Sequence, residues 1–357
     1  MKMSNAVRTI STVAALKAWV RQLESQRVEE FSFLPTGALL ARCPGGDVGS
    51  LVMGLMPRVC SVHTTMSTQG GQLKEVRCRV TYHACVRMLD AWRSHSTAKL
   101  PAEELQAVQQ AQTIVRSIAS RRKRPIEQLY MLYSYVGATI NYKAGDERTA
   151  EFRLLTSAAQ ALLRRIANCQ GFAGVMYLLG GMLGFRMELQ SGRSTAGGHM
   201  WNLVEVGMHR YAMDASAAAV ARSQSRRMLT DYASFLMGRQ EAAENGLTWT
   251  AEKETQPISA SLAAGHDYYH ASGTAFTTVD AAAREIWRRR LAGEKLTHVR
   301  IRGSRALTLE DLTQALHRVG EEPAMNREIF SRLTGKVGYS LLGNSAGKAL
   351  YASVEWQ

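Results

Sequence analysis

The same pattern of a helix followed by a strand occurs near both ends of this chain of 357 residues. In each copy, apolar residues recur with the period of a helix and then alternate with period two, which is typical of an amphipathic helix followed by a half-buried strand. Five apolar pairs share one constant offset of 268 positions (287 − 19): Trp19 and Trp287, Leu23 and Leu291, Val28 and Leu296, Phe31 and Val299, Phe33 and Ile301. The chain is therefore constrained to contain two similar units separated by a long central region. A chance similarity of two helix–strand units is the alternative.

Each copy ends in a pattern typical of a β-hairpin. Alternating segments flank a glycine-rich turn at 68–71, and a second pair flanks a turn at 343–347. Glycine-rich turns between alternating segments predict antiparallel hairpins. We therefore predict two small α+β modules, at residues 1–94 and 276–357, the second repeating the first.

The central region, residues 95–240, has the pattern of a domain with long helices and a few short strands. Helices are predicted at 101–120, 125–140, 157–166 and 169–183, and strands at 186–190, 199–206 and 210–214. This composition predicts helices packed on a small antiparallel sheet, so the whole chain is predicted to have an α+β fold. Residues 241–275 are rich in small and polar residues with weak periodicity, which predicts a linker or irregular segment.

Cys169 stands at the start of an apolar helix pattern, in the sequence Asn168-Cys169-Gln170-Gly171-Phe172-Ala173. A thiol attacks a carbonyl as the thiolate, and the positive end of a helix dipole stabilises a thiolate. The backbone N–H of Cys169 is also a candidate donor to an oxyanion. This position predicts a nucleophile, and a buried structural cysteine is the alternative.

Two further motifs follow, Gly198-His199-Met200-Trp201-Asn202 in one strand pattern and Tyr211-Ala212-Met213-Asp214-Ala215-Ser216 in the next. Side chains alternate along a strand, so His199 and Trp201 share one face. A two-residue turn at Gly207-Met208 would pair residues whose numbers sum to 415 (207 + 208), with Trp201 opposite Asp214 and Asp214 diagonal to His199. A shift of one residue would move Asp214 to the other face of the sheet.

These three motifs, in this order, resemble the transglutaminase-like core, a branch of the papain-like cysteine enzymes, over about residues 100–220. In that family a cysteine begins a helix, a histidine stands in a strand motif His-x-Trp-Asn, and an aspartate follows about fifteen residues later on the next strand. The resemblance implies a triad in which Cys169 is the nucleophile, His199 the base and Asp214 the group that orients the imidazole. The terminal modules also resemble those that bracket such cores in some bacterial proteins.

The residues predicted to support the site are Gln170, Trp201, Asn202 and Tyr142. Tyr142 matches the aromatic residue that commonly ends the helix before the cysteine, Trp201 is expected in the core or the wall of the site, and Asn202 is expected to support the hairpin or the site. No tryptophan lies between Trp92 and Trp201, so the indole that animal crosslinking enzymes direct at the oxyanion is missing. No acidic cluster suits calcium either.

The chemistry implied by the resemblance is attack of Cys169 on an amide carbonyl, which gives a thioester. Release by water would make the protein a peptidase or amidase, and release by an amine would make it a crosslinking enzyme of the transglutaminase kind. Protein or peptide substrates are therefore expected, with no cofactor. Two alternatives stay open: an acyltransferase that uses a thioester donor, as arylamine acetyltransferases do, and a non-catalytic binding module on a degenerate core.

The five cysteines form no C-x-x-C pair, so no metal site is predicted from them. Six histidines also show no spacing that suggests a metal site: His63, His83, His95, His209, His266 and His270. The formal net charge is +14, and residues 281–305 carry eight basic and two acidic side chains. Such a stretch would suit an anionic polymer, and a solvated face is the alternative. No nucleic-acid-binding motif accompanies the charge.

Nothing in the sequence resembles a membrane span, which needs roughly 20 apolar residues, and the polar start lacks the apolar region of a signal peptide. By default the protein is therefore expected in the cytoplasm. A truncated start would instead leave the cell surface or the extracellular space open.

Overall fold

The computed structural model describes residues 7–41, 48–121, 124–146, 148–224, 232–249, 258, 267–333 and 338–356. The chain forms two compact units. Unit 1 contains Met1–Lys123, Tyr142–Leu203 and Thr248–Pro257, and unit 2 contains Arg124–Asn141, Val204–Leu247 and Ile258–Gln357. Residues 95–240 thus contribute to both units, and within the segment 241–275 residues 250–257 and 259–266 lie outside the described residues.

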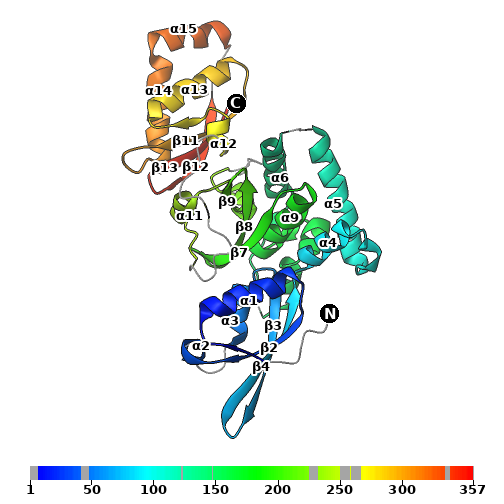
Figure 1. Ribbon diagram of the computed structural model, residues 1–357. Helices are drawn as coiled ribbons and strands as arrows, with labels where there is room; N and C mark the ends of the chain where they lie inside the picture. Colours follow the sequence, from blue (N-terminus) through cyan, green and yellow to red (C-terminus); the bar gives the residue numbers. More distant parts are fainter. Residues whose placement is uncertain are drawn as a thin grey trace. The chain divides into compact units, whose positions relative to one another are not determined.

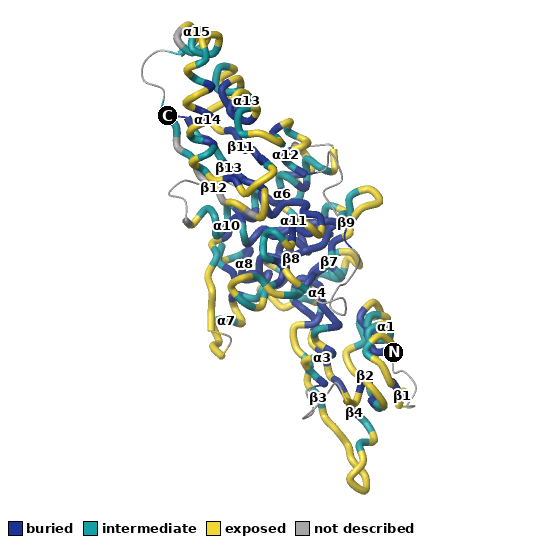
Figure 2. Tube along the Cα trace, turned by 90° about the vertical axis from the view of Figure 1, so that its left-hand side faces the viewer, coloured by how far each residue is buried: buried dark blue, intermediate teal, exposed yellow. Residues whose placement is uncertain are grey.

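Unit 1 begins with a four-stranded sheet of order β1-β2-β4-β3. Its strands are β1 (Arg8–Ile10), β2 (Glu30–Pro35), β3 (Val59–Gln69) and β4 (Gln72–Tyr82), and its helices are α1 (Val13–Ser25), α2 (Gly37–Ala41) and α3 (Val48–Leu55). Trp19 of α1 packs edge-on against Phe31 and Phe33 of β2, with ring centroids 5.4 and 6.0 Å apart. The far end of the β3–β4 hairpin is exposed (Figure 2).

Unit 2 ends with a four-stranded sheet of order β10-β11-β13-β12. Its strands are β10 (Ala275–Phe276), β11 (Leu296–Arg302), β12 (Tyr339–Ala346) and β13 (Ala349–Trp356), and its helices are α13 (Val279–Leu291), α14 (Leu309–Glu321) and α15 (Pro323–Arg332). Trp287 of α13 lies in the core of this sheet, and its indole N–H donates to the Leu316 carbonyl at 3.0 Å.

The two terminal sheets are built in the same way. In each, the first strand runs parallel to the second, and the remaining neighbours are antiparallel. Both parallel pairs join residues 25 positions apart, Arg8 with Phe33 (33 − 8) and Phe276 with Ile301 (301 − 276). A threonine side chain caps the helix between the paired strands in both sheets.

The second hairpin turns later than the sequence pattern indicates. β12 continues through Gly343 to Ala346, which faces Ala349, so the turn lies at Gly347 and Lys348. Gly343 is a strand residue at a close approach of two backbones, because a Cβ there would overlap the Tyr351 carbonyl oxygen. A glycine that permits close approach looks like a turn glycine in the sequence.

The central part of unit 1 is built around helix α9 (Cys169–Met182), in which every residue except Gln170 is buried. Helices α4 (Ala84–Arg93), α5 (Ala102–Arg121) and α8 (Ala158–Arg164) and strand β7 (Met187–Ser194) contact it. The remaining elements are a 3-10 turn (Thr97–Lys99), α7 (Ala150–Leu155), β5 (Asn141–Tyr142), β6 (Ile166–Ala167) and β8 (Gly197–Val206). In Figure 1, α9 lies beside β7 and β8.

Strand β8 continues from unit 1 into unit 2 and turns at Gly207-Met208 into β9 (His209–Met213). The sheet order is β7-β8-β9. Gly207 has a φ of 62°, a conformation that glycine adopts without a steric penalty. The turn is at the predicted position, and the prediction of an α+β fold with helices on a small antiparallel sheet is confirmed.

The other elements of unit 2 are α6 (Pro125–Thr139), α10 (Ala215–Gln224), α11 (Arg239–Glu244) and α12 (Tyr268–Ala271). An aromatic cluster connects α6 to the C-terminal sheet. Tyr232 stacks on Tyr268 with centroids 3.9 Å apart, and both rings contact Tyr130 of α6 and His298 of β11. Burial lowers the pKa of His298 to about 4, so this cluster contains a neutral imidazole near pH 7. No helix among the described residues is long and apolar enough to span a membrane.

We predict that Gly171→Ala destabilises the protein by about 1–3 kcal/mol, a typical cost of overpacking. A Cβ at this position would overlap the Leu155 carbonyl oxygen and lie 2.8 Å from the Ala167 Cβ, and this outweighs the higher helix propensity of alanine. Chemical denaturation measures the loss. The control is Gly198→Ala, which meets nothing within 4 Å and should leave the free energy of unfolding nearly unchanged. Equal stability of the two variants would contradict this packing.

Candidate active site

The start of α9 leaves one backbone N–H group unused. The Asn168 side-chain oxygen accepts from the N–H groups of Gln170 and Gly171 at 3.0 and 3.3 Å, and the Asn168 N–H donates to the Leu155 carbonyl at 3.1 Å. Of the four N–H groups that a helix start leaves without helical partners, only that of Cys169 has no acceptor among the described residues. This N–H is therefore available to an oxyanion beside the Cys169 side chain.

Cys169 differs from the other cysteines that the structure describes. It begins α9 and is 9% exposed. Burial raises the pKa of Cys78 and of Cys85 to about 12, and burial also raises the pKa of Cys60. Those three thiols are disfavoured as thiolates, and Cys43 lies outside the described residues.

His199 lies on β8 and is half-buried. Its imidazole is stacked with the Trp201 indole, with centroids 6.0 Å apart and planes at 26°, as the alternation of the strand predicts. Trp201 is fully buried against Trp249, at a centroid distance of 5.5 Å, and closely approaches Gly192. The buried Trp201 indole therefore provides a fixed surface against which the His199 imidazole packs.

Asn202 ties the strand that carries His199 to the helix that carries Cys169. Its side-chain N–H₂ donates to the Ala173 carbonyl of α9 at 3.0 Å, with a longer contact of 3.5 Å to the Glu188 carbonyl of β7. Asn202 is 1% exposed, so no water competes for this hydrogen bond. A buried amide that bridges two elements fixes their relative position, because breaking it leaves polar groups unpaired.

The N-terminal sheet is attached to this core by a partly buried chain of charges. The Arg58 guanidinium contacts both carboxylate oxygens of Glu188 at 2.9 Å, and the Arg58 N–H donates to the Glu24 carboxylate of α1 at 2.8 Å. Burial raises the pKa of Glu24 despite the nearby Arg21 and Arg58. Because Asn202 also contacts the Glu188 backbone, the chain of contacts runs from α1 through β7 to α9.

The two other predicted supporting residues lie at the first turn of α9. Tyr142 contacts the ring of Phe172, with centroids 6.3 Å apart, and the next N–H, from Lys143, donates to the Ala167 carbonyl at 2.9 Å. Gln170 is the second residue of α9 and is half-exposed. Cys169, His199 and all four predicted supporting residues thus belong to unit 1.

Asp214 belongs to unit 2, between β9 and α10, and is 5% exposed. Its Oδ1 accepts from Ser216 N–H at 3.0 Å, Ser216 O–H at 2.6 Å and Ala217 N–H at 3.4 Å. Its backbone is also held, since its N–H donates to the Ser234 carbonyl and its carbonyl accepts from Tyr133 O–H. These bonds leave the carboxylate little freedom to rotate.

Sequence reasoning missed Ser216, Tyr133 and Ser234 as partners of Asp214. An aspartate directly before a helix is a capping signal, and it could have identified Ser216, the second residue of α10, as a partner of Asp214. Tyr133 and Ser234 are distant in the sequence and carried no signal. The predicted register is supported by an ion pair across the hairpin between Glu205 and Arg210, whose numbers sum to 415 (205 + 210) and whose charged groups are 3.2 Å apart.

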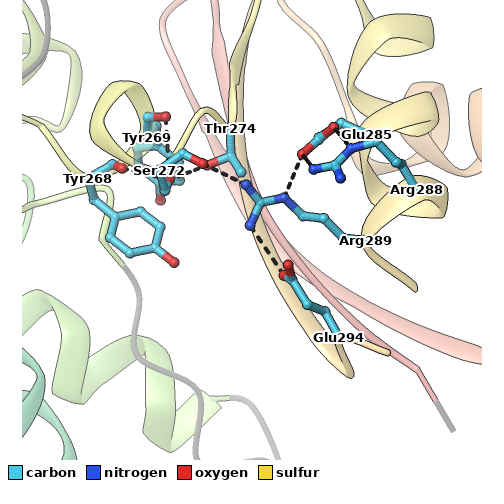
Figure 3. A network of polar contacts seen from close by, with 8 residues as sticks. All are labelled: Tyr268, Tyr269, Ser272, Thr274, Glu285, Arg288, Arg289 and Glu294. Atoms are coloured by element: carbon cyan, nitrogen blue, oxygen red, sulfur yellow. Dashed lines mark hydrogen bonds and ion pairs between the residues drawn. The ribbon is translucent and has the colours of Figure 1, made fainter. Parts of the chain in front are cut away.

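The arginines of the basic stretch are largely paired with carboxylates. Arg289 donates to Glu285 at 2.7 Å, to Glu294 at 3.2 Å and to the Ser272 carbonyl at 2.6 Å (Figure 3). The other pairs are Arg284–Glu322, Arg288–Glu285, Arg300–Asp267, Arg302–Glu244 and Arg305–Asp311. Much of the positive charge of this stretch is therefore balanced locally. Among the described residues there is no group of three or more His, Cys, Asp or Glu that could hold a metal ion.

We predict that Asn202→Asp destabilises the protein more at pH 8 than at pH 5. Burial beside two carbonyl oxygens raises the pKa of the introduced carboxyl group, so its protonated form can still donate at low pH, and stability is lost as the pH rises through that pKa. The loss near pH 8 should reach about 3–5 kcal/mol, as for an unpaired buried charge. Denaturant titration at both pH values measures it.

Asn202→Ala removes the same donor without adding a charge, and it should cost about 1–3 kcal/mol at both pH values. A loss for Asn202→Asp that does not depend on pH would show that the side chain does not face the Ala173 carbonyl.

No protein-family model matches the chain, and no curated protein matches it significantly. It resembles the solved structure of "a TGase" at 14% identity and a TM-score of 0.30, over 43% of this chain and 44% of that one. It also resembles "a Putative Cysteine Protease from Cytophaga hutchinsonii" (10%, TM-score 0.27, 44% and 65%) and "a putative protease from Parabacteroides distasonis ATCC 8503" (8%, TM-score 0.30, 83% and 61%). The chain thus spans less than two thirds of each of these proteins.

Proposed function

We propose that the protein is a cysteine-dependent acyl-transfer enzyme in which Cys169 is the nucleophile, His199 the base and Asp214 the group that orients the base. The observation that carries the proposal is the start of α9. There a thiol lies next to its own unused N–H group, and Asn202 ties the strand of His199 to the same helix. A nucleophile, an oxyanion donor and a base on adjoining elements are the parts that acyl transfer needs.

The proposed reaction proceeds through a thioester. The Cys169 thiolate attacks the carbonyl carbon of a protein or peptide amide. The carbonyl oxygen, on which negative charge develops, accepts a hydrogen bond from the Cys169 N–H. The C–N bond then breaks, and the leaving amine takes the proton that the His199 imidazole holds. Water or a second amine attacks the thioester, gives up its proton to His199 and releases the sulfur as thiolate. Hydrolysis and transfer share every step except the identity of this last nucleophile.

The surroundings of Asp214 suit a carboxylate that orients an imidazole. Three donors hold Oδ1, and the Tyr133 hydroxyl and the Ser234 carbonyl hold the backbone on both sides. A base in a triad is effective only when its tautomer and ring orientation are fixed by such a group. Trp201 supplies a second constraint through the stacking of its indole with His199.

Alkylation by iodoacetamide near pH 6 tests the proposal. An ordinary thiol, with a pKa of about 8.5, is less than about 1% ionised at this pH, whereas a thiolate paired with an imidazolium is largely ionised. Part of this gain is offset by the lower nucleophilicity of a stabilised thiolate, so we expect Cys169 to react about tenfold faster than an unstructured thiol. Mass spectrometry of the Cys169 peptide gives the rate.

The variants His199→Ala and Asp214→Asn should each reduce this rate to that of an ordinary thiol, and Cys169→Ser should remove the fast reaction. Cys60 is exposed but has a raised pKa, so a slow reaction there beside a fast one at Cys169 separates activation of the thiol from simple access. If Cys169 in the wild-type protein reacts no faster than an unstructured thiol, the chain is a binding scaffold and the proposal is wrong. An acyl-enzyme that forms from coenzyme A esters but not from peptides would instead identify a thioester-dependent acyltransferase.

We also predict that Ser216→Ala lowers kcat about tenfold with little change in KM, because Oδ1 of Asp214 loses one of its three donors and the imidazole is held less firmly. Ser216→Thr keeps the hydroxyl and should restore most of kcat. The pH dependence of Cys169 alkylation in both variants reports the effect before a substrate is known. Identical profiles for wild type and Ser216→Ala would argue against this role of Ser216.

A further inference from the structure

The residue before the nucleophile has a role that the triad does not include. Asn168 is 4% exposed, and its side-chain oxygen takes the N–H groups of the second and third residues of α9. Its own N–H donates to the Leu155 carbonyl at 3.1 Å. With both its backbone and its side chain held, Asn168 determines which N–H groups at this helix end stay available.

Charge is the second property of this position. Asparagine and aspartate cap helices about equally well, and an aspartate would also interact favourably with the helix dipole. An aspartate here, however, would place a negative charge one residue from the sulfur, where it would oppose formation of a thiolate. The chain therefore has a neutral cap where stability alone would accept a charged one.

We propose that Asn168 is a positioning residue of the active site, which reserves the Cys169 N–H as the only backbone donor at this helix end and keeps the cap uncharged beside the thiolate. The inference rests on the proposed function, since it concerns the same nucleophile. It also means that any second donor to the oxyanion comes from outside the first turn of α9, because Asn168 already holds the N–H groups of Gln170 and Gly171.

The test compares Asn168→Asp and Asn168→Ala with wild type in the full-length chain. The rate of Cys169 alkylation by iodoacetamide is measured from about pH 4 to pH 10, and thermal unfolding is followed on the same samples. Asn168→Asp should keep or raise the melting temperature, yet move the midpoint of the alkylation profile upward by about one pH unit or more. Asn168→Ala should lower the melting temperature without an upward move of the midpoint, because it removes the cap but adds no charge.

Thr12→Asp is the matched control, because Thr12 caps α1 through the same kind of side-chain bond, to Ala15 N–H at 3.1 Å. It adds the same charge at a helix start and should leave the profile of Cys169 unchanged. Coincident profiles of wild type and Asn168→Asp, with an activated Cys169 in both, would overturn the role of Asn168 alone. A wild-type midpoint near pH 8.5, that of an ordinary thiol, would overturn the proposed function itself, so the two failures are distinguishable.

Discussion

A buried hydrogen bond between Asn202 and the Ala173 carbonyl connects the two elements on which the proposed chemistry depends. It joins β8, which carries His199 and Trp201, to α9, which begins at Cys169. Contacts of the neighbouring elements also stabilise the positions of α9 and of the strands beside it. Because Gly174 and Gly181 lack a side chain, Ala158 and Leu89 pack closely against α9. On the neighbouring strand β7, Glu188 is held by its ion pair with Arg58. The site is therefore supported by rigid elements, which an active site needs to keep its reacting groups in place.

Electrostatics at the start of α9 follows from the same construction. The Asn168 side chain accepts from two of the four N–H groups at this helix start, the Asn168 N–H donates to the Leu155 carbonyl, and the Cys169 N–H remains beside the sulfur. Burial raises the pKa of Cys78 and Cys85, and the pKa of Cys60 is raised by partial desolvation, so all three are disfavoured as thiolates. The position of Cys169 at a helix start, which stabilises negative charge, accounts for the reactivity that we propose.

Much of this arrangement could be predicted from the sequence because its signals are local. The helix that begins at Cys169, the turn at Gly207-Met208 and the helix–strand repeat all follow from short patterns of apolar residues and glycines. What could not be predicted depends on contacts between distant segments, such as Tyr133 with Asp214 or Arg58 with Glu188. The short parallel strands β1 and β10 carry too few residues for any periodicity, and the sequence pattern predicts a turn at Gly343 because a close backbone approach also selects glycine.

We propose that Cys169 exists as a thiolate because His199 holds its proton. The ultraviolet absorbance of thiolates measures this directly, as the difference between wild type and Cys169→Ser between about pH 5 and pH 9. We expect a thiolate signal that is already present near pH 6 in the wild-type protein and disappears at that pH in His199→Ala. A signal that appears only as the pH approaches the range of ordinary thiols, and that is the same with and without His199, would contradict it.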